Sequence, residues 1–440
     1  EKVEIADPGV LEGQVLSAEN GKPIAGARVY SAGKPLDLTT DADGRYAARG
    51  LRAGGPYTIT ISKGGQSEKR EGVFLSLAET LAFDATLGQA TATVVVTGQG
   101  GASKFNSSSM GSGTNINSAQ LNALASIQRN LQDYARTDPR VAQTDKERGE
   151  ISAGGQNSRY NTITIDGVNI SDTFGLEGNN LPTLKQPISI DAIQSVQVNL
   201  SNYDVTQKGY TGANINAVTK SGTNEWHGGV YYVFRNEQLA GDRWDRAKSD
   251  YFLAPAFKET TKGVSIGGPI IKDKLFVYAN YEELHSSRGT PTFGPVGSPL
   301  QNVGITPSAI SSFQAIAKNK YGIDVGTLDV PSGAEVAVKD MLLKLDWNIS
   351  DQHRASLRYS SSEQSQANIV GFGSNSLALS GYLYQRDFDF ESTTAQVFSD
   401  WNDTFSTEFK VSYRDYSAVR TPVDDRPAIG IRIGNPFLNI

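Results

Sequence analysis

The chain from Trp226 onwards contains seven runs in which apolar and polar side chains alternate, and this pattern limits the possible folds more than any other feature. In "MLLKLDWNIS", for example, Leu343, Leu345 and Trp347 alternate with Lys344 and Asp346. Successive side chains of a strand point to opposite faces, so each run predicts a strand with one apolar and one polar face. Such strands occur both in membrane barrels and in soluble sandwiches. The seven runs lie near 226–236, 262–270, 274–284, 339–350, 353–362, 392–403 and 406–416.

The connections between these runs distinguish the two architectures. The turns "IKD", "SDQ" and "DTF" are short, whereas the connections over 237–261, 285–338 and 363–391 are long, and the two kinds alternate along the chain. Outer-membrane barrels have short periplasmic turns and longer outer loops, but a soluble sandwich has no reason to place every long loop at one end. The alternation therefore favours a transmembrane antiparallel β-barrel.

Aromatic residues recur near the ends of these runs and predict girdles at the two membrane interfaces, because amphipathic rings favour the headgroup level. The expected girdle residues are Tyr231, Tyr232, Phe234, Tyr278, Tyr281, Trp347, Tyr359, Trp401, Tyr413 and Tyr416.

Composition excludes several functions. The 440 residues carry a net charge of −6 without a cluster of Lys or Arg, so nucleic acid is not an expected partner. The absence of cysteine excludes disulfides and thiolate chemistry. Neither of the two methionines is at position 1, which indicates a processed or partial chain.

Catalytic and metal-binding motifs are missing as well. The three histidines, His227, His285 and His353, form no HExxH or paired ligand spacing, and neither GxSxG nor GxxxxGK[ST] occurs. We therefore expect no catalytic residues, no metal, no cofactor and no enzymatic activity.

The first ninety residues alternate short strand-like runs with Gly, Pro, Asn and Asp, which predicts a small β-sandwich. In "TTDADGRY", Asp43-Gly44 predicts a hairpin turn. The alternative, a calcium loop beginning at Asp41, lacks the rest of an EF-hand loop and its closing Glu.

The middle of the chain reads as a mixed α/β unit. After the linker-like "GQGGASKFNSSSMGSGTN", a single helix is predicted, with Asn117 or Ser118 as its cap and Asp138-Pro139 as its stop. Strands are predicted around "NTITIDGVNISD" and "AIQSVQVNL". The helix prediction rests on the helical spacing of Leu121, Leu124, Ile127, Leu131 and Tyr134.

The chain resembles two known families. The segments "GQV", "GKPIAGA" and "TTDADGRY" resemble the carboxypeptidase regulatory-like domain. The segments "SRYNTITIDGVNISDTFGLEG", "SIDAIQSVQVNLSNYDV", "YTGANINAVTKSGTNEWHG" and "KGVSIGGPIIKDKLFVYANYEEL" resemble the plug and first barrel strands of TonB-dependent outer-membrane receptors, in particular the Oar-like group.

The resemblance implies a mainly β protein of the Gram-negative outer membrane, without enzymatic activity. It implies a sandwich over 1–88, a TonB-box segment and linker over 89–116, an α/β plug over 117–224 and a partial barrel over 225–440. Barrels of this type close with roughly 22 strands, and an open edge in lipid leaves unpaired backbone groups. We therefore interpret the chain as the N-terminal part of a longer barrel and expect "GIRIGNPFLNI" to begin a further strand.

The stretch "TATVVVTGQG" is the candidate site for a periplasmic energising protein of the TonB type. Thr93, Val94, Val95, Val96 and Thr97 form a strand-like run between flexible segments, which suits pairing with a strand of another protein. The run resembles the family's TonB box, although Gly98 replaces the usual Ala. The alternative is that these residues form the last strand of the first domain.

The expected function is energised movement of a bulky substrate across the outer membrane, in contact with outer-membrane lipid. The substrate (siderophore, glycan, peptide or protein) and the direction of transport stay open. The long outer loops are expected to recognise it. The loop over 285–338 holds a predicted short helix capped by Thr306 with Pro307 in its first turn. Two alternatives remain, a SusC-like glycan importer paired with a surface lipoprotein and a non-transporting surface adhesin.

Overall fold

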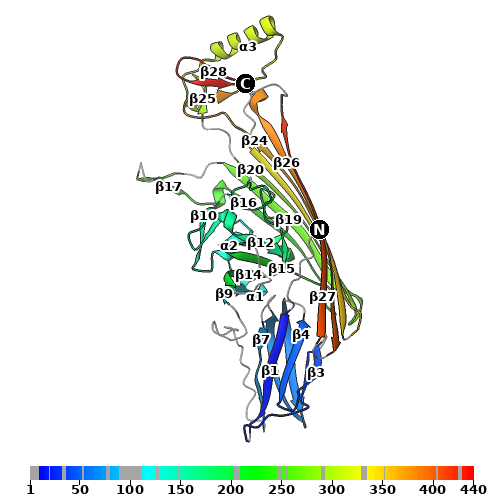
Figure 1. The fold of residues 1–440 in the computed structure, drawn as a ribbon. Coiled ribbons are helices and arrows are strands. Elements are labelled where there is room, and N and C mark those ends of the chain that lie inside the picture. Colours follow the sequence, from blue (N-terminus) through cyan, green and yellow to red (C-terminus); the bar gives the residue numbers. More distant parts are fainter. Residues whose placement is uncertain are drawn as a thin grey trace.

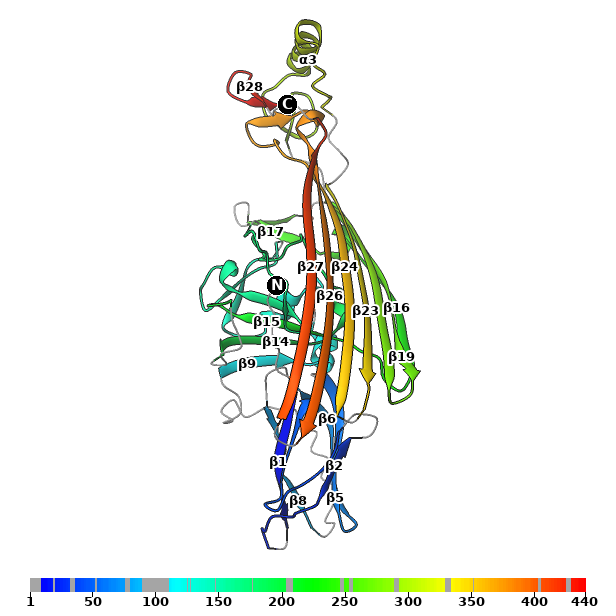
Figure 2. The same ribbon diagram turned by 45° about the vertical axis from the view of Figure 1, so that its right-hand side comes forward.

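The computed structural model describes residues 9–440, except for residues 19, 32–35, 52–53, 76–79, 89–110, 125, 127, 147, 176, 203–208, 246–248, 253–255, 289–292, 329–333, 351, 403–404 and 425–428. The chain forms an N-terminal sandwich, a middle domain and a seven-stranded sheet that carries a small head (Figure 1). The middle domain lies against one face of the sheet, with the sandwich at one end of the strands and the head at the other (Figures 1 and 2). No helix within the described ranges is long and apolar enough to span a membrane.

Two facing sheets form the N-terminal sandwich, as the spacing of the short runs predicts. One sheet has the order β4-β1-β7, with β8 also paired to β1, and the other has the order β3-β2-β5-β6. A tight turn forms at Asp43-Gly44, where Gly44 has φ +69° and its N–H donates to the Asp41 carbonyl at 3.0 Å. The predicted hairpin is wrong, because the turn carries the chain from one sheet to the other, so that β3 pairs with β2 and β4 pairs with β1. The strands are β1 (Gly9–Ser17), β2 (Arg28–Ser31), β3 (Leu36–Thr39), β4 (Arg45–Leu51), β5 (Gly54–Lys63), β6 (Gln66–Leu75), β7 (Thr80–Ala82) and β8 (Ala85–Leu87).

The middle domain is built on a five-stranded sheet of order β13-β12-β15-β14-β9, in which β12 and β15 are parallel. Every residue of β12 and β15 is buried, and Ile163, Ile165, Ile215 and Ala217 belong to the apolar core of the domain. A separate hairpin joins β10 to β11. The elements are β9 (Gly111–Ile116), α1 (Ser118–Ala123), α2 (Leu131–Ala135), β10 (Val141–Asp145), β11 (Glu150–Ala153), β12 (Thr162–Ile165), β13 (Val168–Asn169), β14 (Ile193–Asn202) and β15 (Asn214–Thr219), with 3-10 helices at Ser158–Tyr160 and Ile190–Ala192.

The prediction of one continuous helix after Asn117 is wrong, because two short helices occupy this segment. Asn117 caps α1 in a capping box with Gln120, but the backbone turns extended at Leu124, which is 39% exposed. Asn130 then starts α2 by accepting a hydrogen bond from the Asp133 N–H. An Asn side chain that binds nearby backbone amides favours a helix start over a helix interior. Leu131 and Tyr134 are buried as expected, and Ile127 lies outside the described residues.

The seven predicted alternating strands are confirmed, in the predicted order. They form one antiparallel sheet of order β16-β19-β20-β23-β24-β26-β27, with short turns at one end and long connections at the other. Most strands extend beyond the predicted runs toward the long connections. The strands are β16 (His227–Asn236), β19 (Phe257–Ile271), β20 (Leu275–Arg288), β23 (Ala334–Asn348), β24 (His353–Asn368), β26 (Tyr384–Asn402) and β27 (Phe405–Pro422).

We call the side of this sheet that faces the middle domain its inner face and the opposite side its outer face. Three predicted girdle residues lie on the inner face, so their assignment to the lipid interface is wrong. Tyr231 and Tyr278 donate hydrogen bonds to the middle domain or to an inner carboxylate, and Tyr416 packs against the middle-domain core. Girdle residues on the outer face include the exposed side chains of Tyr232, Phe234, Tyr281, Trp347, Trp401 and Tyr413.

The long connections fold into a hairpin and a compact head. The head has its own apolar core, which includes Ile305, Leu377 and Leu438. Its helix α3 begins after Thr306, whose hydroxyl accepts from the Ala309 N–H at 3.2 Å, as the sequence predicts. The segment expected to begin another barrel strand instead forms β28 and β29 beside β25. The elements are β17 (Arg243–Asp245), β18 (Asp250–Phe252), β21 (Phe293–Gly294), β22 (Gln301–Asn302), α3 (Pro307–Tyr321), β25 (Ser376–Ala378), β28 (Gly430–Arg432) and β29 (Phe437–Asn439), with 3-10 helices at Glu237–Leu239 and Ser380–Tyr382.

Candidate functional site: the contact between the middle domain and the sheet

Asp166, in the turn between β12 and β13, is the centre of the contact between the middle domain and the inner face. Its carboxylate accepts hydrogen bonds from the Thr219 N–H and hydroxyl, each at 2.8 Å, within the middle domain. Arg358 of β24 donates to the same carboxylate at 2.6 Å, and Lys344 Nζ of β23 lies 3.8 Å from it. One carboxylate therefore joins two strands of the middle domain to two strands of the sheet.

Backbone carbonyls strengthen the same cluster. Arg358 also donates to the Ile165 carbonyl, and Lys410 of β27 donates to the Asp166 carbonyl, each at 3.0 Å. Burial alone would raise the pKa of Asp166, but Lys344, Arg358 and the hydrogen bonds from Thr219 outweigh it and hold the pKa below its usual value. Asp166 is therefore ionised, and its charge is matched by cations of the sheet.

A second cluster surrounds Arg129, which precedes α2. Its guanidinium binds the carboxylate of Asp191 in the middle domain and that of Glu282 on β20, the latter at 3.1 Å. Glu282 also accepts from the Ser189 hydroxyl at 3.0 Å and from the Tyr231 hydroxyl at 2.5 Å. Burial lowers the pKa of Arg129, but the two carboxylates outweigh it and raise the pKa above its usual value. This cluster joins the middle domain to β16 and β20.

Both clusters contain residues with unusual backbone conformations. Asp166 and Arg129 have φ of +48° and +51°, in the left-handed region that non-glycine residues seldom adopt. On β19, a Cβ at Gly263 would lie 2.2 Å from the Tyr231 ring, so the glycine makes room for the tyrosine that reaches Glu282. Strained or side-chain-free positions of this kind concentrate where a structure must place functional groups.

A third set of contacts lies toward the head. Arg386 of β26 binds the Glu177 carboxylate, and the Gln364 side chain of β24 forms two hydrogen bonds with the backbone of Lys185, at 2.9 and 3.2 Å. The middle domain has its own apolar core, to which the sheet adds few buried side chains, among them Tyr278, Leu342 and Phe390. The contact is therefore mainly polar, and separating the two parts exposes little apolar surface.

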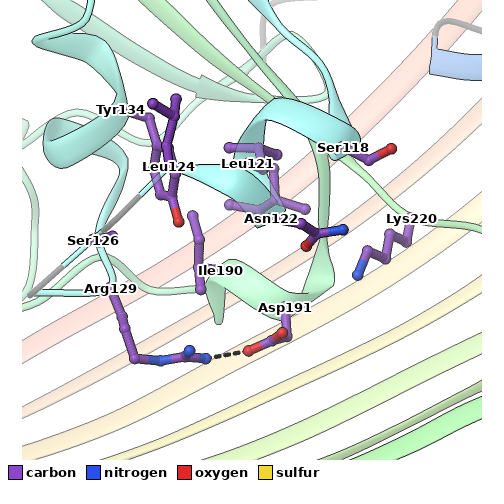
Figure 3. A pocket seen from close by; sticks show the side chains of 11 residues that line it. Ser118, Leu121, Asn122, Leu124, Ser126, Arg129, Tyr134, Ile190, Asp191 and Lys220 are labelled. Atoms are coloured by element: carbon purple, nitrogen blue, oxygen red, sulfur yellow. Dashed lines mark hydrogen bonds and ion pairs between the residues drawn. The ribbon is translucent and has the colours of Figure 1, made fainter.

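A cavity of about 210 Å³ lies beside the Arg129–Asp191 pair (Figure 3). It separates Leu121 and Asn122 of α1 from the 3-10 helix Ile190–Ala192, and Lys220 lines it on the other side of Asp191. Burial lowers the pKa of Lys220, and the Asp191 carboxylate opposes this shift. The cavity is therefore lined both by α1 and by the charged pair of the second cluster.

The predicted partner-binding residues Thr93, Val94, Val95, Val96 and Thr97 lie outside the described residues. The first described strand after them is β9, which lies at the edge of its sheet and, among the described strands, pairs with β14 alone. Thr114 of β9 also donates from its hydroxyl to the buried Asp138 carboxylate at 2.7 Å.

We expect acid to weaken the attachment of β9 to the rest of the middle domain. Burial alone would raise the pKa of Asp138, but hydrogen bonds from Arg140 and Thr114 outweigh it and lower the pKa to about 2. Because this pKa lies below that of an unfolded Asp, the stabilisation is present above about pH 4 and is lost as pH falls through about 2. We expect a loss on the order of 1–2 kcal/mol in that window. Hydrogen exchange of the Asn115 and Ile116 amides across the window measures it.

The control is Asp138→Asn, which should lower protection of these amides at neutral pH and remove most of the change between pH 4 and 2. An unchanged acid response in this variant would show that another group holds β9.

The sequence predicted only some of the residues that form the contact between the middle domain and the sheet. Lys344 and Lys410 stand on predicted polar strand faces and do face the middle domain, as that pattern indicates. Asp166 was visible only as part of a family-like motif, and neither spacing nor charge indicated its partners. Arg129 and Glu282 were missed, because 153 positions separate them and no local pattern joins them. Among the described residues, no group of three or more His, Asp or Glu is arranged to hold a metal ion.

Comparisons with known proteins agree with this architecture. Residues 10–88 match the family described as carboxypeptidase regulatory-like domain, and residues 218–328 match the family described as outer membrane beta barrel domain. The chain is 27% identical over 293 residues to the TonB-dependent transporter Oar of Myxococcus xanthus. That match covers 63% of this chain and 27% of the relative, so the chain spans well under half of the protein it resembles.

A solved structure shares the fold. The outer membrane transporter YddB from Escherichia coli superposes with a TM-score of 0.50 at 15% identity, over 69% of this chain and 38% of that chain. These relatives are transporters rather than enzymes. The chain is thus a Gram-negative outer-membrane protein, a homologue of the TonB-dependent transporter Oar, with a carboxypeptidase regulatory-like domain and part of an outer-membrane β-barrel.

Proposed function

We propose that the complete protein is a TonB-dependent transporter in which the middle domain is the plug. The supporting observation is the polar contact described above, which holds the middle domain on the inner face through charged pairs at Asp166, Arg129 and Glu177. Polar contacts can exchange for water, so the plug can move without exposing a large apolar surface. The function requires no catalysis and no cofactor.

The energising protein would bind Thr93 to Thr97 as an added strand. A strand that joins an extended segment supplies main-chain hydrogen bonds, which resist a pull along the chain. The force would pass through residues 98–110 to β9, whose one partner in the described part of the chain is β14. An edge strand with one partner has half the ladder hydrogen bonds of a central strand, so β9 would leave the sheet before β12, β14 or β15.

The substrate would enter from the side of the head. The long connections there form an ordered head with its own core, so they present a defined surface rather than loose loops. We propose a bulky substrate, since a small solute would not need a plug to be displaced. Its chemical class stays open among siderophores, glycans, peptides and proteins.

A cysteine reporter tests the proposal without knowledge of the substrate. Ile116 of β9 is 3% exposed, and the chain has no cysteine of its own. In cells that express the full-length Ile116→Cys protein, we expect a periplasmic maleimide to label this cysteine only when the energising protein and the proton gradient are both present. The label is read on the purified protein by mass spectrometry.

The matched control is Ile163→Cys, which places a cysteine at an equally buried position on the central strand β12. It should stay unlabelled in energised cells. Equal labelling of Ile116→Cys with and without the energising protein would contradict the proposal.

A further inference from the structure

The outer face of the seven-stranded sheet changes from apolar to charged at a similar distance from the short turns on each of six strands. Next to the turns, the outward side chains are apolar or uncharged, for example Ile266, Leu343, Leu357 and Phe409, each more than 40% exposed. Along six of the strands, the first outward charge follows eight to eleven positions from the strand end at the turn. We call these six residues the boundary row: Lys262, Glu283, Lys339, Glu363, Glu391 and Asp415.

The distance varies little although the strands differ in length. It is eight positions from Leu275 to Glu283 on the 14-residue β20 and eleven positions from Asn402 to Glu391 on the 19-residue β26. Charged residues nearer the turns on these strands are inward, such as Lys344, whose Nζ reaches Thr219 of the middle domain at 2.8 Å. The boundary therefore belongs to the outer face alone.

Neighbouring members of the row are paired across the strands. Lys262 Nζ lies 2.7 Å from the Glu283 carboxylate, and Lys339 Nζ lies 3.6 Å from that of Glu363. The Tyr281 hydroxyl donates to Glu283 at 2.6 Å from two positions closer to the turn. A tyrosine whose ring lies on apolar surface and whose hydroxyl points to charge is typical of the headgroup level of a membrane.

The length of the uncharged stretch on each strand identifies the lipid bilayer as the partner of the outer face. A tilted β-strand needs about 9–11 residues to cross the hydrocarbon of a bilayer. The outer apolar band of an outer-membrane barrel is about 25 Å tall, which fits the eight to eleven positions seen here. We propose that the boundary row marks the level where the lipid headgroups of the outer leaflet meet the sheet.

Lipid acyl chains then cover only the band between the boundary row and the short turns. Lys262 and Lys339 supply cations at the level of the anionic headgroup phosphates. Beyond the row, β26 continues to Tyr384 and β27 to Pro422, seven positions further on each strand. At about 3.3 Å per residue and a tilt near 45°, these extensions raise the head roughly 15 Å above the headgroups.

Single cysteines test this placement in the full-length protein, because the chain has none. The variants form two matched pairs, Lys339→Cys with Leu343→Cys on β23 and Glu391→Cys with Ala395→Cys on β26. Intact cells are treated with a membrane-impermeant maleimide. We expect labelling at 339 and 391 and loss of labelling at 343 and 395, which label only after denaturation in detergent. Heat-modifiable mobility on gels shows that each variant is assembled in the membrane.

Three other labelling results would overturn the placement of the boundary row at the headgroup level. Labelling at 343 and 395 as strong as at 339 and 391 puts the lipid boundary closer to the turns, and no labelling at any of the four puts it closer to the head. Labelling at 339 and 391 that is absent in cells but appears in proteoliposomes of lipopolysaccharide and phospholipid shows that another protein, and not lipid, covers the row.

Discussion

Replacing Asp166 with asparagine is expected to weaken the attachment of the middle domain to the sheet by about 3–5 kcal/mol, since removing one partner of a buried ion pair leaves the other charge uncompensated. Arg358 is 3% exposed, and Lys344 is 9% exposed, so neither cation can recover its hydration when the carboxylate becomes neutral. Asparagine tolerates the positive φ at this position and keeps an acceptor for Thr219. The substitution therefore removes charge with little other change.

The measurement is hydrogen exchange of the Thr162–Ile165 amides in the full-length protein in detergent micelles. Faster exchange in Asp166→Asn than in the unchanged protein reports opening of β12 beside the lost ion pair. The control is Asp145→Asn in the β10–β11 hairpin, where Asp145 lies 3.8 Å from an exposed Arg148. An exposed pair of this kind contributes about 0–1 kcal/mol, so exchange at β12 should not change. Equal exchange in both variants would show that apolar packing, and not the ion pairs, holds the middle domain in place.

Replacing Val95 with proline is expected to abolish binding of the energising protein, and with it transport. Proline has no N–H and fixes φ, so it would interrupt the main-chain ladder that we propose residues 93–97 form with the energising protein. Purified full-length protein and the periplasmic domain of a TonB-type protein are mixed, and binding is measured by calorimetry. The expected result is loss of detectable binding with unchanged folding of the receptor.

The matched control is Ala102→Pro, which places the same residue in the linker after the candidate strand. This variant should bind normally, because residue 102 lies outside the candidate strand and proline is tolerated in linkers. If Val95→Pro instead unfolds the N-terminal sandwich, residues 93–97 belong to that domain. If both variants bind normally, the recognition strand lies elsewhere.

Local patterns predicted the elements whose structure depends on neighbouring residues. The seven sheet strands follow from period-two alternation, and α3 follows from Thr306 and Pro307 at its start. The prediction of a single helix after Asn117 failed. The helical spacing of apolar residues continues past Asn130, but Asn130 starts a new helix there. The inward placement of Tyr231, Tyr278 and Tyr416 also escaped prediction, since the recurrence of aromatic residues along the strands does not show which face each ring occupies.

The sequence by itself determined the strands, their order and which residues share a face, because alternation and turn length are local properties of the chain. It also supplied the candidate strand Thr93 to Thr97 and the resemblance to outer-membrane receptors. Only the tertiary structure decided that Asp166 meets Arg358 and that Arg129 meets Glu282. Such pairs join residues more than 150 positions apart, and their partners depend on how the middle domain lies on the sheet, which no local pattern encodes.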